Sequence, residues 1–281
     1  MKIAVLSGKG GTGKTLVSVN MASASKRSVY VDCDVEEPNG YLYFKPEELE
    51  IENITLSIPV VNQARCNGCQ KCVEFCNFNA LAYTGKKLIV FDEVCHACGG
   101  CVMVCPEKAL SERQRVIGEV KVGKTGDTWV LTGMLNPGEV SGVPIINRLL
   151  EKEKAYENKG LTIIDCPPGS ACSVMESIKE ADYCLLVAEP TIFGSQNLQM
   201  VHELVQLFQK PHGVVLNKCL DDENPSEQYC LDKGVHILGR IPFDREIGRL
   251  NSNAQILVNE NTTYKAMFDS LIARIRKEVV K

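Results

Sequence analysis

The sequence predicts an α/β fold, in which helices flank a mostly parallel sheet and a second, cysteine-rich domain is inserted. Short apolar runs at 3–6, 161–164 and 183–188 end in polar residues and are separated by helical patterns, as in parallel strands joined by crossover helices. Between residues 66 and 105 the helical pattern nearly vanishes, and this stretch holds eight of the fourteen cysteines. We therefore expect one large domain with an insert.

The composition is that of an ordinary soluble protein. Its 281 residues are 44% hydrophobic and carry a net charge of −4, so no basic surface for nucleic acid is expected. No apolar run approaches the ~18 residues of a membrane span, and the N-terminus leads straight into a glycine-rich loop rather than a cleavable apolar segment. We expect a cytoplasmic protein without membrane association, in which so many cysteines indicate metal or redox chemistry rather than disulfides.

Residues 8–15 read GKGGTGKT and match the phosphate-binding motif G-x-x-x-x-G-K-S/T. In this motif, backbone N–H groups turn inward around polyphosphate oxygens, Lys14 adds a positive charge, and the Thr15 hydroxyl can ligate Mg²⁺. The apolar run 3–6 and the helical pattern 16–25 supply the strand and helix that the motif requires, which disfavours an ordinary glycine-rich turn. The predicted nucleotide-binding residues are Gly8, Gly10, Gly11, Thr12, Gly13, Lys14 and Thr15.

Acidic residues follow two of the predicted strands. Asp32 and Asp34 come after a short β-rich run, and Asp165 follows the run 161–164. Because ligands bind at the carboxyl ends of parallel strands, these carboxylates are expected near the phosphate loop. There Asp165 can anchor Mg²⁺ through water, and the polar residues 36–39 suit a loop beside the γ-phosphate. The alternative for Asp165 is a carboxylate that only caps a helix.

The cysteine-rich stretch repeats itself at an offset of 29 residues, and each half reads C-x₂-C-x₂-C-x₃-C. This is the spacing of bacterial ferredoxins, in which three close thiolates hold one cluster and the fourth reaches across to the other. It predicts two [4Fe–4S] clusters in an inserted, ferredoxin-like α+β domain of residues 62–112, between outer-domain segments 1–61 and 113–281. Zinc usually takes two separated cysteine pairs and is disfavoured. The predicted ligands are Cys66, Cys69, Cys72 and Cys105 for cluster 1, and Cys95, Cys98, Cys101 and Cys76 for cluster 2.

The sequence allows two interpretations for each of three further sets of residues. Residues 116–135 alternate around the turn 123–127, and we favour a β-hairpin over a second phosphate loop because the full motif spacing is lacking. The apolar stripe of the predicted helix 264–280 fits packing against the sheet better than a membrane-surface anchor. Asn217 and Pro242 each follow a predicted strand and are either purine-binding residues or ordinary turn residues.

With these motifs, nearly the whole chain resembles the MinD and ParA class of deviant-Walker ATPases, and more narrowly MinD-like ATPases with an inserted ferredoxin domain. The resemblance implies a P-loop NTPase fold and Mg²⁺-dependent hydrolysis of ATP to ADP and phosphate. The motifs that carry it are Lys9 within the phosphate loop, Asp32-x-Asp34, Asp165-x-Pro-Pro-Gly, Glu189-Pro-Thr and the eight-cysteine insert.

The resemblance also implies roles for individual residues. Lys9 corresponds to the signature lysine, which reaches across a nucleotide-sandwich dimer to the partner's phosphates. Asp34 corresponds to the residue that orients the attacking water, so Lys9, Lys14 and Asp34 are the expected catalytic residues. The other implied contacts are those of Asp32 and Asp165 with Mg²⁺, and of Asn217 and Pro242 with adenine.

Two relatives within this class indicate different functions. The nitrogenase iron protein uses MgATP to gate electron transfer, whereas Mrp-type proteins carry iron–sulfur clusters to recipients. The eight-ligand pattern favours stable clusters, so we expect an ATP-hydrolysing iron–sulfur protein whose nucleotide cycle is coupled to electron transfer. The alternatives are an ATP-dependent cluster carrier or assembly factor, and a redox-sensing, MinD-like spatial organiser.

The same resemblance implies assembly on ATP binding. We expect a homodimer, or a heterodimer with a paralogue, and an unidentified redox or iron–sulfur protein as a further partner. Cys172 follows the Pro-Pro-Gly turn and is either a cluster ligand, a redox thiol or an ordinary small apolar residue.

Overall fold

The computed structural model describes residues 1–220 and 223–279, which fall into two compact units. Unit 1 consists of Met1–Ile51, Val120–Met134 and the chain from Val143 onward, and unit 2 of Glu52–Glu119 and Leu135–Gly142. The segment 62–112 lies within unit 2.

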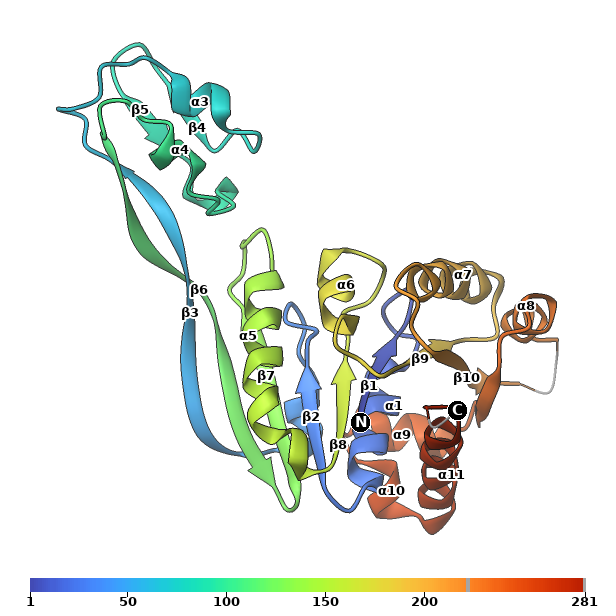
Figure 1. Ribbon diagram of the computed structural model, residues 1–281. Helices are drawn as coiled ribbons and strands as arrows, with labels where there is room; N and C mark the ends of the chain where they lie inside the picture. The colour runs from blue at the N-terminus through green and yellow to red at the C-terminus, as the bar shows by residue number, and fades with distance from the viewer. Residues whose placement is uncertain (221–222, 280–281) are drawn as a thin grey trace. The chain divides into compact units, whose positions relative to one another are not determined.

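Unit 1 is built on a mostly parallel sheet, as the sequence predicts. The described strands of this sheet follow the order β11-β10-β9-β1-β8-β2-β7-β6-β3 (Figure 1). All pairings from β11 to β7 are parallel. The strands are β1 (Lys2–Leu6), β2 (Ser28–Asp32), β3 (Glu47–Val61), β6 (Leu110–Thr125), β7 (Thr128–Leu135), β8 (Leu161–Asp165), β9 (Tyr183–Ala188), β10 (His212–Cys219) and β11 (Ile237–Pro242).

Helices cover both faces of this sheet (Figure 1). On one face α1, α10 and α11 pack together, and on the other α5 packs on α6 and α7 on α8. The helices of unit 1 are α1 (Lys14–Ala24), α2 (Gly40–Phe44), α5 (Val143–Glu153), α6 (Cys172–Ile178), α7 (Ile192–Leu207), α8 (Pro225–Lys233), α9 (Arg245–Ser252), α10 (Leu257–Glu260) and α11 (Thr262–Val279), with a 3₁₀ segment η2 (Lys154–Lys159) after α5.

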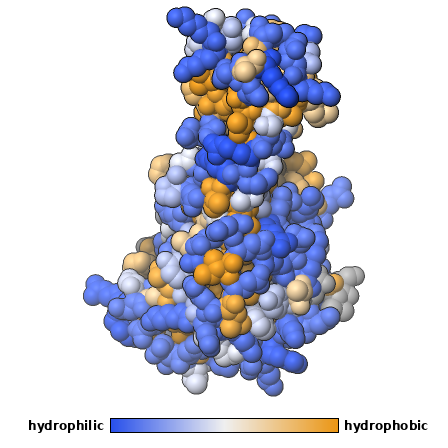
Figure 2. All heavy atoms as spheres, turned by 90° about the vertical axis from the view of Figure 1, so that its left-hand side faces the viewer, coloured by the Kyte–Doolittle hydropathy of each residue, from blue (hydrophilic) through white to orange (hydrophobic). Residues whose placement is uncertain are grey.

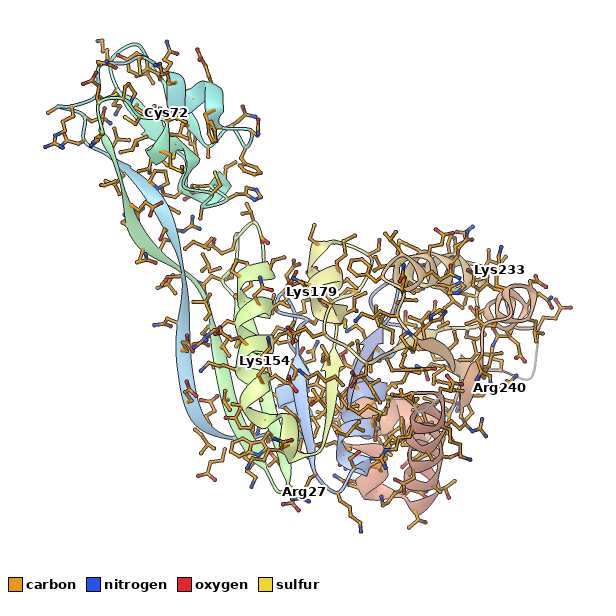
Figure 3. All side chains as sticks on the ribbon, in the orientation of Figure 1. Arg27, Cys72, Lys154, Lys179, Lys233 and Arg240 are labelled. Carbon is orange, nitrogen blue, oxygen red and sulfur yellow. The ribbon has the colours of Figure 1, made fainter. Side chains whose placement is uncertain are left out.

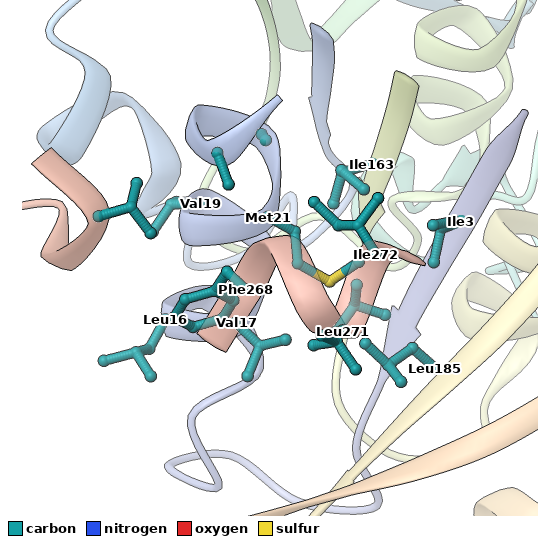
Figure 4. Close-up of a cluster of buried hydrophobic side chains, with 14 of the residues drawn as sticks. Ile3, Leu16, Val17, Val19, Met21, Ile163, Leu185, Phe268, Leu271 and Ile272 are labelled. Carbon is teal, nitrogen blue, oxygen red and sulfur yellow. The ribbon is translucent and has the colours of Figure 1, made fainter. Parts of the chain in front are cut away.

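The last helix packs against the sheet through its apolar stripe. Phe268 and Ile272 of α11 lie in one buried cluster with Met21 of α1 and with Ile3 and Leu185 of the central strands (Figure 4). The predicted packing of this helix is therefore confirmed for its described part, while Val280 lies outside the described residues. Among the residues described, no helix is long and apolar enough to cross a membrane.

The predicted hairpin is confirmed as β6 and β7. Only Gly126 and Asp127 separate the two strands, so they run in opposite directions, and Gly126 has the positive φ of 54° that such a tight turn requires. The residues 123–125, which look like part of a second phosphate loop, belong to β6 instead.

Two element boundaries differ from the sequence prediction. The apolar residues of 54–61 predict a strand there, whereas β3 begins at Glu47. Its first residues are rich in glutamate, which is uncommon in strands, and this masks the alternation of Leu49 and Ile51 with their neighbours. The amphipathic pattern of 201–208 predicts a helix there, whereas α7 begins at Ile192, with the Thr191 hydroxyl accepting a 2.8 Å bond from the Gly194 N–H as its N-cap. Its first turns expose Ile192 and Phe193, which hides the amphipathic stripe in the sequence.

Unit 2 is small and its core is made partly of cysteines. Strands β4 (Leu81–Tyr83) and β5 (Leu88–Val90) pair antiparallel, and two short helices, α3 (Lys71–Phe75) and α4 (Gly100–Met103), begin 29 residues apart, with a 3₁₀ turn η1 (Asp92–Val94) between the halves. These helices are too short to show a periodic pattern in the sequence. The buried core residues are Cys72, Ala80, Leu81, Leu88, Cys101 and Leu110, of which Cys72 is labelled in Figure 3.

Replacing Phe268 by alanine tests the packing of α11. Phe268 is fully buried, so Phe268→Ala should lower the free energy of unfolding by about 3–5 kcal/mol, measured by urea denaturation. Ser270→Ala on the exposed face of the same helix is the matched control and should change it by less than about 0.5 kcal/mol. Equal effects of the two substitutions would contradict this packing.

Candidate functional site

The glycine-rich loop joins the end of β1 to the start of α1, and its glycines are required for close packing. A Cβ atom at Gly8 would lie 2.3 Å from the backbone oxygen of Asn197, and one at Gly13 would lie 2.1 Å from the side-chain nitrogen of Asn217. Gly11 and Gly13 also have positive φ angles of 76° and 99°. Only glycine satisfies both conditions at residue 13, so the loop conformation follows from the sequence.

Lys14 lies in a buried position between two carboxylates. Its Nζ atom is 3.1 Å from Asp165 Oδ1 and 3.3 Å from Asp34 Oδ2, although the three residues belong to α1, the end of β8 and the loop after β2. Burial alone would lower the pKa of Lys14, but the charges of Asp165 and Asp34 outweigh it and raise the pKa above its ordinary value. Lys14 is therefore charged, and it is balanced by carboxylates rather than by water.

Asp32 and Asp165 meet because β2 and β8 are parallel neighbours in which these two residues are directly paired. Asp32 accepts a 2.9 Å bond from the Gly40 N–H, and Asp165 accepts a 2.9 Å bond from the Tyr30 hydroxyl. Burial, with the charge of Asp165 adding to it, raises the pKa of Asp32 to about 8. Such a buried carboxylate pair has the oxygen-donor chemistry that Mg²⁺ prefers, and the Thr15 hydroxyl of the neighbouring loop is a further donor of this kind.

Lys9 forms an ion pair with Glu189 of the same chain, at the end of β9. Lys218, whose Nζ atom donates a 2.7 Å bond to the Gly11 carbonyl, approaches the same carboxylate at 3.6 Å. Although partial burial alone would raise the pKa of Glu189, bonding to Lys9 and the nearby Lys218 charge lower it below its ordinary value. The Lys9 side chain is 38% exposed, so it is held on the surface and not inside the loop.

A cleft of about 700 Å³ runs along the loop, which is ample for a nucleotide. Its walls include Lys9, Lys14, Thr15 and Asp34 of the predicted residues. The sequence analysis missed two residues of the same cleft, Tyr43 and Asn251, whose side chains share a 2.8 Å hydrogen bond from the Tyr43 hydroxyl to Asn251 Oδ1. Neither belongs to a motif, so no pattern in the sequence indicated them.

The two predicted adenine contacts lie outside the walls of this cleft. Asn217 is buried at the end of β10 and donates a 2.7 Å bond from Nδ2 to the Thr12 carbonyl, which ties the strand to the phosphate loop. Pro242 is the exposed last residue of β11. The structure thus brings Asn217 to the loop and leaves Pro242 apart from it.

Unit 2 contains two cavities, each lined by four cysteines from both halves of the repeat. Both are small, with a volume of about 20 Å³ each. The first, which we call the polar cavity, is lined by Cys66, Cys69, Cys72 and Cys105, and the second, which we call the aromatic cavity, by Cys76, Cys95, Cys98 and Cys101.

Each cavity brings together four cysteine thiols, which have the donor chemistry of a four-thiolate site. Tetrahedral zinc with bonds of about 2.3 Å needs thiolates about 3.8 Å apart. Within residues 1–220 and 223–279, no three His, Cys, Asp or Glu side chains are grouped closely enough to hold a single ion. The cysteines surround a hollow instead, and burial raises the pKa of Cys101 to about 11, so this thiol is neutral until a cation is bound.

A family model places the nucleotide-binding unit among known proteins. The model of the CobQ/CobB/MinD/ParA nucleotide-binding domain matches residues 3–258. The chain belongs to this family. Among members of known structure, MinD from Pyrococcus horikoshii complexed with Mg-ADP is 17% identical, with a TM-score of 0.61 over 98% of this chain and 95% of that one. MinD in the MinC:MinD complex of Aquifex aeolicus is 16% identical, with a TM-score of 0.59 over 99% and 96% of the two chains. These likenesses show a shared fold.

Relatives in sequence include two uncharacterized proteins of Methanocaldococcus jannaschii. MJ0578 is 28% identical over 99% of this chain and 97% of its own length, and MJ0579 is 28% identical over 78% and 80%. A shorter match, 38% identical over 56 residues, covers 20% of this chain and 21% of a protein of the ion-translocating oxidoreductase complex from Methanosarcina acetivorans.

Two glycine substitutions test the loop of this family member in the absence of nucleotide. Gly13→Ala should destabilise the protein by more than about 1 kcal/mol, because its φ is positive and its Cβ would collide with Asn217. Gly10→Ala is the matched control, since a Cβ there meets nothing within 4 Å, and should leave the stability almost unchanged. Urea denaturation compares the two, and a Gly13→Ala protein as stable as the control would overturn this account of the loop.

Proposed function

We propose that this protein binds and hydrolyses MgATP and couples its nucleotide cycle to electron transfer through two [4Fe–4S] clusters. One observation carries the proposal. The same chain has a phosphate loop beside paired strand-end carboxylates and two cavities that are each lined by four cysteines. Phosphate loops and four-thiolate sites serve different chemistries, so their presence in one chain indicates a coupled function.

The nucleotide chemistry follows from the charges around Lys14. Bound phosphates would accept hydrogen bonds from the loop N–H groups and draw Lys14 away from Asp34, which now lies 3.3 Å from it. Asp34 would then be available to orient the attacking water. Mg²⁺, held by Thr15 and by Asp165 through water with Asp32 nearby, would offset the phosphate charge. The Mg-ADP bound to the P. horikoshii relative supports an adenine nucleotide, and we propose Asn217 and Pro242 as its base contacts.

Lys9 is placed to act outside its own loop. We propose that it leaves Glu189 when two chains meet across the nucleotide, in a homodimer or a heterodimer with a paralogue, and contacts the partner's phosphates. The 38% exposure of the Lys9 side chain supports this exchange, in which the largely buried Glu189 would lose its ion pair with Lys9 and keep the nearby charge of Lys218.

The cysteines that line the two cavities are the candidate cluster ligands. We propose that Cys66, Cys69, Cys72 and Cys105 hold one cluster and Cys76, Cys95, Cys98 and Cys101 the other, each residue as a thiolate. Bound clusters would supply one-electron transfer to an unidentified redox partner. After Asp34 the chain runs through α2 and β3 into unit 2. This covalent connection offers a route for coupling between the two units.

Iron content tests the cluster ligands. The protein reconstituted without oxygen should hold about eight iron atoms per chain, and Cys76→Ser should lower this toward about four, because one cubane loses a ligand. Cys172→Ser is the control, since Cys172 is an exposed thiol that lines neither cavity, and should keep the full content. Full iron content in Cys76→Ser would contradict the assignment.

The rate of ATP hydrolysis tests the coupling. We expect the rate of ATP hydrolysis to differ at least about twofold between protein with oxidised clusters and protein with reduced clusters. Nucleotide can favour one oxidation state of the protein only if the two oxidation states bind nucleotide with different affinity. Absorbance or electron paramagnetic resonance reports the oxidation state during turnover. Lys14→Ala should abolish hydrolysis in both states. Equal rates in the two states would remove the coupling, and hydrolysis by Lys14→Ala would remove the assigned site.

A further inference from the structure

The two cysteine cavities can be compared position by position because the repeat relates them. In each cavity one cysteine crosses over from the other half, Cys105 in the polar cavity and Cys76 in the aromatic cavity. Both crossing cysteines receive the same backbone support. The Ala109 N–H donates to Cys105 Sγ at 3.3 Å, and the Ala80 N–H donates to Cys76 Sγ at 3.4 Å. The N–H support of the two Sγ atoms is therefore equal, while the next residue differs, with Pro106 after Cys105 and Asn77 after Cys76.

One side-chain pair bridges the two halves at each cavity, at equivalent positions of the repeat. At the aromatic cavity, the ring of Phe78 stacks on that of His96, with centroids 3.9 Å apart and planes 15° from parallel. The equivalent residues at the polar cavity are Glu107 and Asn67, and here Asn67 Nδ2 donates a 3.0 Å hydrogen bond to Glu107 Oε1. Each pair ties the segment after the crossing cysteine to the loop that carries the first two ligands.

A second contact reinforces the aromatic cavity. Phe75, which precedes Cys76, lies against the backbone of Gly100, where a Cβ atom would come within 2.0 Å of its ring. The equivalent residues at the polar cavity are Val104 and Lys71, a smaller side chain and an exposed charged one. Cys76 is thus flanked in the chain by two aromatic residues, Phe75 and Phe78, that contact the other half of the repeat.

The two kinds of contact differ in how strongly they keep the segment after the crossing cysteine from separating from the loop of the first two ligands. The bond between Asn67 and Glu107 is exposed, so water can replace both of its partners at little cost. A stacked ring pair loses its contact outright when the segments separate, and water does not restore it. Figure 2 shows apolar side chains on the surface of unit 2. Phe75 and Phe78 are 47% and 39% exposed and His96 is exposed as well, so the contrast between the pairs lies in the kind of contact and not in burial.

The residues that cover the cavities from within one half do not alter this contrast. Tyr83 lies against Gly68 at the polar cavity, and its equivalent Glu112 lies against Gly99 at the aromatic one. Both contacts stay inside one half of the repeat. They shape the loop of the first two ligands but do not hold the crossing cysteine.

We propose that the polar cavity is the exchangeable cluster site and the aromatic cavity the permanent one. The inference rests on the proposed function, in that both cavities hold a [4Fe–4S] cluster. Exchange begins when the bond between Cys105 and iron breaks and a donor atom of an acceptor, such as a thiolate of another protein, takes its place. Cys105 then takes up a proton, and no electrons are transferred. The protein would keep an electron carrier at Cys76 while passing on the other cluster.

Iron release to a chelator tests this directly. The full-length reconstituted protein is incubated without oxygen with EDTA, and cluster absorbance and released iron are followed over time. Two phases of equal amplitude are expected, with rates about two- to tenfold apart, the range expected from one aromatic pair. A single phase would overturn the inference while leaving the two clusters in place. Protein that takes up no cluster would overturn both this inference and the cluster assignment.

Exchanging the pairs between the cavities assigns the phases. Asn67→His with Glu107→Phe installs the aromatic pair at the polar cavity and should slow the fast phase. Phe78→Glu with His96→Asn installs the polar pair at the aromatic cavity and should speed the slow phase. Should either double variant fail to assemble, Glu107→Ala alone should accelerate only the fast phase. Phe91→Ala, an exposed aromatic residue that lines neither cavity, is the control and should alter neither phase. Phases that do not respond to these exchanges would overturn the inference.

Discussion

The nucleotide-binding unit depends on the charge balance around Lys14. A buried ammonium group requires nearby carboxylates, and Asp165 and Asp34 supply them at 3.1 Å and 3.3 Å. Those carboxylates converge because β2 and β8 are parallel neighbours with Asp32 opposite Asp165. Removing Lys14 would leave Asp165 buried without its cation, whereas removing Asp34 would still leave the pair of Lys14 with Asp165. A polyphosphate with its cation is the kind of ligand that can take the place of Asp34 beside Lys14 without upsetting the balance.

The glycines of the loop have two roles. They free backbone N–H groups for phosphate, and they also let Asn197 and Asn217 approach at distances that exclude any side chain. Asn217 in turn bonds to the Thr12 carbonyl and holds the loop in place from β10. A loop that is held from two sides before a ligand arrives loses less conformational freedom on binding, which favours affinity.

In unit 2 a repeated sequence forms two cavities with equal backbone support and unequal side-chain contacts. The hydrogen bonds that backbone N–H groups donate to Cys76 and Cys105 are equivalent. The side-chain pairs differ, because one cavity has a stacked ring pair and the other has an exposed amide–carboxylate hydrogen bond. A symmetric scaffold can thus carry two sites of different stability, because surface side chains set the ease of opening while the backbone sets the ligand positions. In the function proposed above, this contrast would let one chain keep one cluster for electron transfer and pass on the other.

The sequence by itself determined the features that depend on local spacing. The phosphate loop, the strands with continuous apolar runs and the hairpin at Gly126 follow from residues that are close in the chain, because such patterns dictate backbone conformation directly. Strand β3 was predicted too short because its first residues are rich in glutamate, which is uncommon in strands, and Tyr43 and Asn251 were missed because they belong to no motif. Only the tertiary structure decided which remote residues meet: Lys14 with Asp165, Lys9 with Glu189, and Tyr43 with Asn251. These contacts depend on strand order and register, which arise from the packing of the whole sheet.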